Sequence, residues 1–354
     1  MMTIASCKKK GCTDPTALNY NPEAEVSNGL CEYENDNYTL VGLIESDRTL
    51  TADHIWTLSG RVAVTNGATL TIEPGTIIKA EAGSGGAASS LIIAQGAKII
   101  ADGTATNPII FTAESDNIQL GELSGTNLDI NVNGLWGGLM ILGNAPISAI
   151  TSPFQIEGIP ASDPNGLYGG NDPADNSGRL RYVSIRHGGT SIGAGNEING
   201  LTLGGVGSET IIENIEIVAN TDDGLECFGG TANVSNLLVL AVGDDCLDLD
   251  QGYSGTINNS VIIPGLSTDH SLELDGGEGN TNPSFTITNC ELDNTLIWPW
   301  PSYVHFRSQA NGNVSLFGDF DIEADAGTNV VVDTLSGVGF DRNIFTWTYY
   351  GQHL

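Results

Sequence analysis

The sequence predicts an all-β protein: a right-handed parallel β-helix, or solenoid, with a small disulfide-closed module at its N-terminus. Three observations predict the β-helix: a repeat of 22 to 25 residues, strands of alternating apolar and polar residues, and abundant glycine with few helix signals. Glycine supplies 46 of 354 residues, and 40% of the chain is hydrophobic. We therefore expect many short strands joined by tight turns around a continuous core.

The repeat is clearest between residues 199 and 277. Asn214, Asn236 and Asn259 recur at intervals of 22 and 23 residues, and an equivalent leucine recurs in every coil. We expect the asparagines to form a hydrogen-bonded ladder, continued by Asn289, and the leucines to form an inward stripe. The leucines are Leu201, Leu225, Leu247 and Leu272.

Strand patterns continue on both sides of this region, so the β-helix is predicted to occupy residues 37–354. Two polar stretches, residues 114–134 and 161–178, break the period and are expected to project from the coils as loops. Residues 1–10 are interpreted as a tether, and residues 11–36 as a separate cysteine-closed module.

The charge balance narrows the classes of partner. Acidic residues outnumber basic residues 43 to 12, which gives a net charge of -31. Such a field repels nucleic acid and attracts cations, so we expect polysaccharide or calcium, and no nucleic acid, as partners. Solubility in a salty medium is the alternative explanation. We find no motif for an organic cofactor and expect a monomer.

Acidic residues recur at fixed positions of the repeat. Two outward positions follow the inward leucine, and two further positions lie in the turn that enters each strand. Coils stack about 4.8 Å apart, so these like charges must be relieved by a cation, by protonation or by turn amides. The four columns are Glu226, Asp248 and Glu273; Asp250 and Asp275; Asp222, Asp244 and Asp269; and Asn199, Asp223, Asp245 and His270.

Two chemistries fit such columns. Calcium takes six to eight oxygen ligands, and inverting glycoside hydrolysis uses two carboxyl groups about 6.5 to 9.5 Å apart. We therefore expect the columns to bind a ligand or to carry out catalysis. The expected calcium ligands are Asp222, Asp244, Asp245 and Asp269.

Four short motifs resemble, in order, the active-site motifs of the polygalacturonases, pectin hydrolases that share the β-helix fold: Asn220-Thr221-Asp222, Asp244-Asp245-Cys246, His270 and Arg307. The resemblance implies that Asp244 is the general acid and that Asp222 and Asp245 hold the attacking water. It implies that His270 and Arg307 orient the sugar. This sequence departs from the pattern, because His270 lacks flanking glycines and no lysine follows Arg307.

A longer resemblance covers nearly the whole β-helix. Residues 199–207, 222–224 with 228–230, 272–276 and 345–348 resemble a large family of exported bacterial β-helix lipoproteins. That resemblance implies an outer-membrane or cell-surface location without a settled activity.

The N-terminus carries two further resemblances. Ile4-Ala5-Ser6-Cys7 resembles a bacterial lipobox, which implies a lipid anchor on Cys7 in a membrane; a disordered tail is the alternative. Six residues precede Cys7, fewer than an export signal needs. The next segment, from Gly11, resembles the GCTDPxAxNYNP modules of exported Bacteroidota proteins. It is too small to bury a core, so we expect a disulfide between Cys12 and Cys31.

Aromatic residues supply the last candidates for ligand binding. Trp298, Trp300 and Tyr303 lie in a proline-stiffened segment, where they either stack on sugar rings or cap the open end of the solenoid; we favour the cap. Tyr253 is a further candidate for sugar stacking. The sequence thus favours a surface lipoprotein that binds polysaccharide, with a polygalacturonase-like hydrolase or lyase and a non-catalytic adhesin or structural protein as alternatives.

Overall fold

The structure, a computed structural model, describes residues 8–30 except 16 and 18, residues 38–191, 198–279 and 281–336, and residue 349. The chain divides into two compact units, Met1–Tyr38 and Thr39–Leu354. Within the described residues, no helix has the length and apolar character needed to cross a membrane.

The small unit contains two short parallel strands, β1 (Lys10–Gly11) and β2 (Val26–Ser27). Cys12 is buried in this unit. Cys7 and Cys31 lie outside the described residues, so lipidation and the Cys12–Cys31 disulfide stay predictions.

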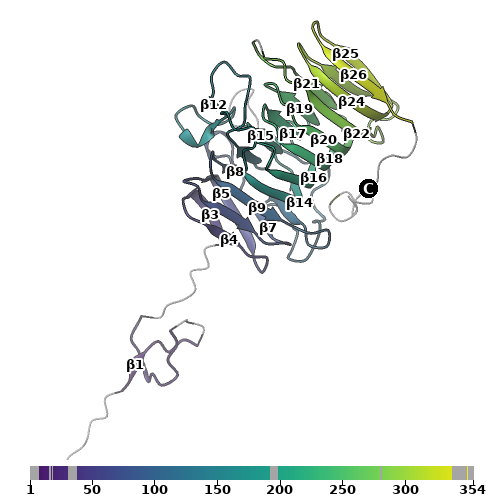
Figure 1. Cartoon of the computed structure of the whole chain (residues 1–354). Coiled ribbons are helices and arrows are strands. Elements are labelled where there is room, and N and C mark those ends of the chain that lie inside the picture. The colour runs from purple at the N-terminus through teal and green to yellow at the C-terminus, as the bar shows by residue number, and fades with distance from the viewer. Residues whose placement is uncertain are drawn as a thin grey trace, which may run out of the picture. The chain divides into compact units, whose positions relative to one another are not determined.

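The large unit is a parallel β-helix, as the repeat predicts. Its strands stack rung upon rung, each pairing in parallel with the equivalent strand one coil later (Figure 1). One row of strands carries the candidate site and is called the first sheet. Its members are the second half of β5 (Ile55–Val64), then β8 (Ser90–Ile93), β11 (Leu139–Leu142), β15 (Leu201–Gly204), β17 (Leu225–Phe228), β19 (Leu247–Asp250), β21 (Leu272–Leu274), β23 (Ser302–Phe306) and β25 (Phe320–Ala324).

The remaining strands form the other walls of the coils. Long strands such as β16 bend at one residue and continue into the next wall. These strands are β3 (Thr39–Ile44), β4 (Arg48–Leu50), β6 (Thr69–Ile72), β7 (Ile77–Ala80), β9 (Lys98–Asp102), β10 (Ile109–Ala113), β14 (Gly178–Arg186), β16 (Ile211–Val218), β18 (Asn233–Leu240), β20 (Thr256–Ile263), β22 (Phe285–Leu292), β24 (Asn311–Gly318) and β26 (Asn329–Thr334).

The inward stripe of leucines is confirmed. Leu201 pairs with Leu225 and Leu225 with Leu247, and each side chain is fully buried. Leu272 continues the stripe and pairs with Val304. Burial of a leucine contributes about 1.5 to 3 kcal/mol relative to exposure, so this stripe is a main source of stability.

The asparagine column is confirmed at three rungs and altered at the fourth. Asn214, Asn236 and Asn259 have positive φ angles of 57°, 57° and 59°, a conformation that asparagine tolerates better than most residues. Asn236 donates to Asn214 at 3.0 Å, and Asn259 donates to Asn236 at 2.6 Å. Asn289 keeps the bend, with φ 54°, but its amide donates to Asn258 instead of Asn259.

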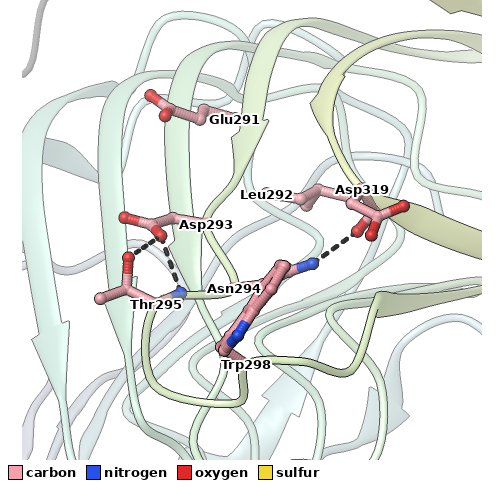
Figure 2. A pocket seen from close by; sticks show the side chains of 7 residues that line it. All are labelled: Glu291, Leu292, Asp293, Asn294, Thr295, Trp298 and Asp319. Carbon is pink, nitrogen blue, oxygen red and sulfur yellow. Dashed lines mark hydrogen bonds between the residues drawn. The ribbon is translucent and has the colours of Figure 1, made fainter.

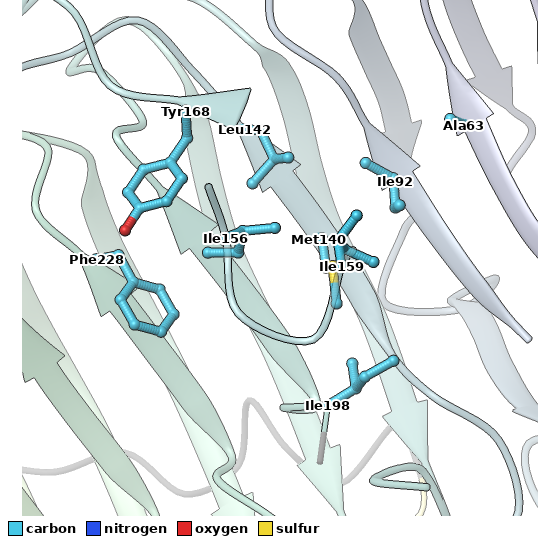
Figure 3. Close-up of a cluster of buried hydrophobic side chains, with 9 residues drawn as sticks. All are labelled: Ala63, Ile92, Met140, Leu142, Ile156, Ile159, Tyr168, Ile198 and Phe228. Carbon is cyan, nitrogen blue, oxygen red and sulfur yellow. The ribbon is translucent and has the colours of Figure 1, made fainter. Parts of the chain in front are cut away.

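Residues 114–134 and 161–178 leave the regular coils, as predicted. The second loop belongs to a longer excursion between β11 and β14 that holds β12 (Phe154–Gln155), the 3-10 helix η2 (Pro164–Gly166) and β13 (Leu167–Tyr168). A further 3-10 helix, η1, spans Gly85–Ala87. The excursion folds back on the first sheet, where Ile156, Ile159 and Tyr168 pack in one cluster with Met140 and Leu142 (Figure 3).

Candidate functional site

One outward column runs the length of the first sheet. Glu226 pairs with Asp248 and Asp248 with Glu273, so the predicted stack of acids is confirmed. His305 of β23 extends the stack by pairing with Glu273, and Glu323 of β25 follows. The column in order is Ala63, Ile92, Met140, Thr202, Glu226, Asp248, Glu273, His305 and Glu323.

A second outward row lies two residues further along each strand. Phe228 pairs with Asp250, as predicted, and the amide of Asp275 donates to Leu249 of the preceding rung. Arg307 follows and places a positive charge beside the acids: its Nε lies 3.7 Å from Asp275 Oδ1. We call the acids on rungs β17 to β21 and in their entry turns the acidic face. Its members are Asp222, Asp223, Glu226, Asp244, Asp245, Asp248, Asp250, Asp269, Glu273 and Asp275.

Turn amides satisfy part of this charge. The backbone N–H of Asp245 donates to Asp223 Oδ1 at 2.9 Å, and the backbone N–H of His270 donates to Asp245 Oδ1 at 2.8 Å. Asp223 and Asp245 are both buried, whereas Asp244 is exposed and Asp222 half-buried. The predicted columns are therefore present, but the inner one also serves as backbone capping between coils.

Burial and like charge disfavour ionisation of several of these acids. Desolvation, followed by repulsion from Asp222, holds the pKa of Asp223 well above its ordinary value. Desolvation and then the charge of Glu273 raise the pKa of Asp245 to about 8. Desolvation and then Asp250 raise the pKa of Asp275 to about 7.

Glu226 and Asp248 show the same effect. Desolvation, then the charge of Asp248, raises the pKa of Glu226 well above normal. For Asp248, desolvation is followed by repulsion from Asp223. Glu226 was expected to face a ligand, but its side chain is buried and accepts a hydrogen bond from the buried amide of Asn199. A cation or bound protons would relieve this part of the acidic face.

Carboxylate oxygens gather in two groups that suit calcium. One oxygen each from Asp222, Asp223 and Asp244 lie within 4.8 Å of one another, and so do oxygens from Asp223, Glu226 and Asp248. Calcium takes only oxygen ligands of this kind, so both donor sets fit it. Asp245 and Asp269, predicted to be calcium ligands, belong to neither group. Asp245 is engaged instead with His270 through both backbone and ring nitrogens.

The proposed hydrolase residues are brought together only in part. His270 Nδ1 lies 2.7 Å from Asp245 Oδ1 and 3.1 Å from Glu273 Oε2. Arg307 Nη1 lies 3.3 Å from Glu273 Oε1. These contacts join His270 and Arg307 to the acidic face through Glu273, a residue that the motif resemblance does not include.

The tryptophans do not cap the solenoid, which corrects the preferred expectation. Trp298 and Trp300 are 78% and 69% exposed, and strands β23 to β26 continue the coils beyond them. They lie on the surface because the segment between β22 and β23 bulges from the coil, so their faces are available for stacking.

Two pockets border these tryptophans. Trp300 and Tyr303 line a pocket of about 270 Å³ together with Asp269 of the acidic face. Trp298 lines another of about 570 Å³ with Asp293, Asn294 and Asp319 (Figure 2). An aromatic face beside carboxylate and amide groups is suited to a sugar ring, which offers an apolar face and hydroxyl groups.

Tyr253 was expected to stack on sugar, and this expectation is wrong. Its side chain is 2% exposed, and its hydroxyl donates to the Ala232 carbonyl oxygen at 2.6 Å. The tyrosine closes the turn after β19 against the preceding coil. Sequence alone gave no sign of this, because an exposed and an inward-folded turn have the same residue pattern.

Comparison with known proteins agrees with this architecture. The family described as a pectate-lyase-like β-helix domain matches residues 42–302. Comparisons with curated proteins and with solved structures find no match.

Proposed function

The chain belongs to the pectate-lyase-like β-helix family, and on that premise we propose that it binds polysaccharide along the acidic face and the adjoining aromatic pockets. The observation that carries the proposal is the pocket in which exposed Trp300 stands beside Tyr303 and Asp269. Sugar rings stack on the tryptophan, and their hydroxyls donate to the carboxylates.

Charge limits the glycans that fit. An acidic face repels uronates unless a cation bridges the two, so neutral polysaccharides bind directly and acidic ones bind through calcium. We propose the groups built on Asp223 as the calcium positions, because all their donors are oxygens. As part of the same proposal, the protein is exported and held at the cell surface by a lipid on Cys7.

Catalysis is the second candidate. Buried Asp245, with a pKa of about 8, stands beside exposed Asp244. Neighbouring carboxyls in such different environments are the usual basis of an acid and base pair. Against this role, Asp245 Oδ1 already accepts from His270. An adhesin or structural protein would use the same binding face without turnover.

Affinity electrophoresis in gels containing neutral or acidic polysaccharides tests the binding proposal. Trp300→Ala should weaken retardation by roughly 10-fold, since a stacked aromatic contributes on the order of 1 kcal/mol or more. Ile150→Ala is the matched control, because Ile150 is 96% exposed and lines neither pocket. Equal retardation of parent and Trp300→Ala on every glycan contradicts the proposal.

The same glycans, assayed for new reducing ends or unsaturated products, separate binding from catalysis. Turnover that disappears in both Asp244→Asn and Asp245→Asn supports the hydrolase or lyase. Binding without turnover in the parent leaves the non-catalytic function.

A further inference from the structure

Two histidines and a glutamate meet at the C-terminal end of the first sheet. Glu273 of β21 pairs with His305 of β23, and His270 lies in the turn that enters β21. One ligand atom from each of the three lies within 4.8 Å of the other two. The ring centroids of the two histidines are 5.3 Å apart. Donor atoms of two imidazoles and a carboxylate therefore lie close enough together to share one ion.

His270 is held firmly in this cluster. It is 8% exposed, and its Nδ1 lies 2.7 Å from Asp245 Oδ1. Tyr303 stacks on its ring at 5.0 Å with an interplanar angle of 23°. Asp245 and Glu273 contact the same ring nitrogen, so two carboxylates and the stacked tyrosine together hold the His270 ring in the cluster.

Glu273 is oriented from the opposite side. Arg307 Nη1 lies 3.3 Å from Oε1, while Oε2 faces His270 Nδ1 at 3.1 Å. The next rung adds donors, because His305, Glu323 and Asp325 also place ligand atoms within 4.8 Å of one another. One carboxylate oxygen of Glu273 thus contacts the Arg307 guanidinium, and the other contacts His270.

We propose that His270, Glu273 and His305 form a binding site for a divalent transition-metal ion of the zinc class. Imidazole nitrogen suits zinc, copper and nickel, whereas calcium and magnesium take oxygen ligands. Three protein ligands leave a position for water or for a further ligand, as in zinc sites that are not purely structural. The proposal does not rest on polysaccharide binding, since no glycan is needed to form the site.

A proton competes with the metal for this position. Imidazole binds a metal only when it is deprotonated.

Titration of the metal-stripped full chain with zinc, against a chromogenic chelator, tests the site. We expect one zinc per chain that His305→Ala weakens by roughly 100-fold or more, a loss at least as large as that caused by removing a supporting group. His54→Ala is the control and should bind zinc like the parent, because half-buried His54 pairs with Asp53 away from the cluster. Cobalt should give a visible absorption spectrum that His305→Ala abolishes.

Thermal unfolding in EDTA checks that the variants fold. If His305→Ala does not fold, Glu273→Gln takes its place with the same expected loss. Equal zinc affinity in the parent and in a folded variant overturns the proposal. Displacement of zinc by millimolar calcium also overturns it, because that result assigns the metal to the oxygen-only groups.

Discussion

The first sheet has one backbone geometry and two kinds of outer surface. On rungs β8 and β11 the outward column holds Ile92 and Met140, and the excursion after β11 covers them with Ile156 and Ile159 (Figure 3). From β17 onward the same column holds acids and then His305. The change occurs at Thr202, one rung before Glu226.

The comparison shows that the backbone geometry of the coil does not determine the function of its outer face. The N-terminal rungs use that face to extend the hydrophobic core, which favours stability. The C-terminal rungs place like charges one strand spacing apart, which costs stability unless a proton, cation or ligand is present. The acidic face, with its closely spaced like charges, is therefore suited to binding a cation or another ligand.

A charge placed in the covered half should have the largest effect. Met140→Asp buries a carboxylate among Ile156 and Ile159 and should reduce the free energy of unfolding by about 3 to 5 kcal/mol, measured in denaturant. Leu43→Asp is the control, because Leu43 of β3 pairs with Ala63, the first residue of the column, but is 56% exposed. It should change stability by no more than about 0.5 kcal/mol. Similar effects of both substitutions would mean that the two halves do not differ as described.

Removal of a charge from the acidic half should act in the opposite direction. The raised pKa of Glu226 means that the folded state binds its proton more tightly than the unfolded state. That contribution to stability is full below the unfolded pKa, about 4.3, and is lost as the pH rises through the folded pKa.

Glu226→Gln should therefore stabilise the protein at pH 8 by roughly 2 kcal/mol and have little effect at pH 4. Asp275 and Asp245, with pKa values of about 7 and 8, give the parent the same downward slope between pH 4 and 8. Melting temperatures across this range measure the slope. A parent that becomes more stable toward pH 8 would contradict the assignment.

Calcium should have the smallest effect of the three. At ten times its dissociation constant it should stabilise the parent by about 1.4 kcal/mol at pH 8, seen as a higher melting temperature that EDTA reverses. Asp223→Asn should lose this response, because Asp223 belongs to both oxygen groups. Asp333→Asn, an exposed acid of β26 outside the acidic face, should keep it. A melting temperature that neither calcium nor EDTA moves rules out these calcium positions.

The periodic part of the fold could be predicted from the sequence, because stacked rungs need the same kind of residue at each equivalent position. Leu225 and Leu247 recur since an inward position must be apolar, and Asn214 and Asn236 recur since the bend needs a positive φ. The acidic columns followed from the same register. Their positions were therefore predictable, although their partial burial was not.

Features outside the period were not predictable. His305 was missed because the bulge between β22 and β23 hides its register, which appears only when β23 pairs with β21. The burial of Tyr253 and the exposure of Trp298 depend on how individual turns fold against neighbouring coils. The signal that would have identified His305 is a histidine at the outward position of an alternating strand, Ser302–Phe306.

The asparagine bends have a consequence for how such a molecule changes over time. Because Asn214, Asn236 and Asn259 turn the chain at the same point of successive coils, the cross-section is nearly the same at each of these rungs. A whole coil can therefore be added or removed while the cross-section is kept, whereas a slip of one residue within a strand would turn the inward side chains of that strand outward.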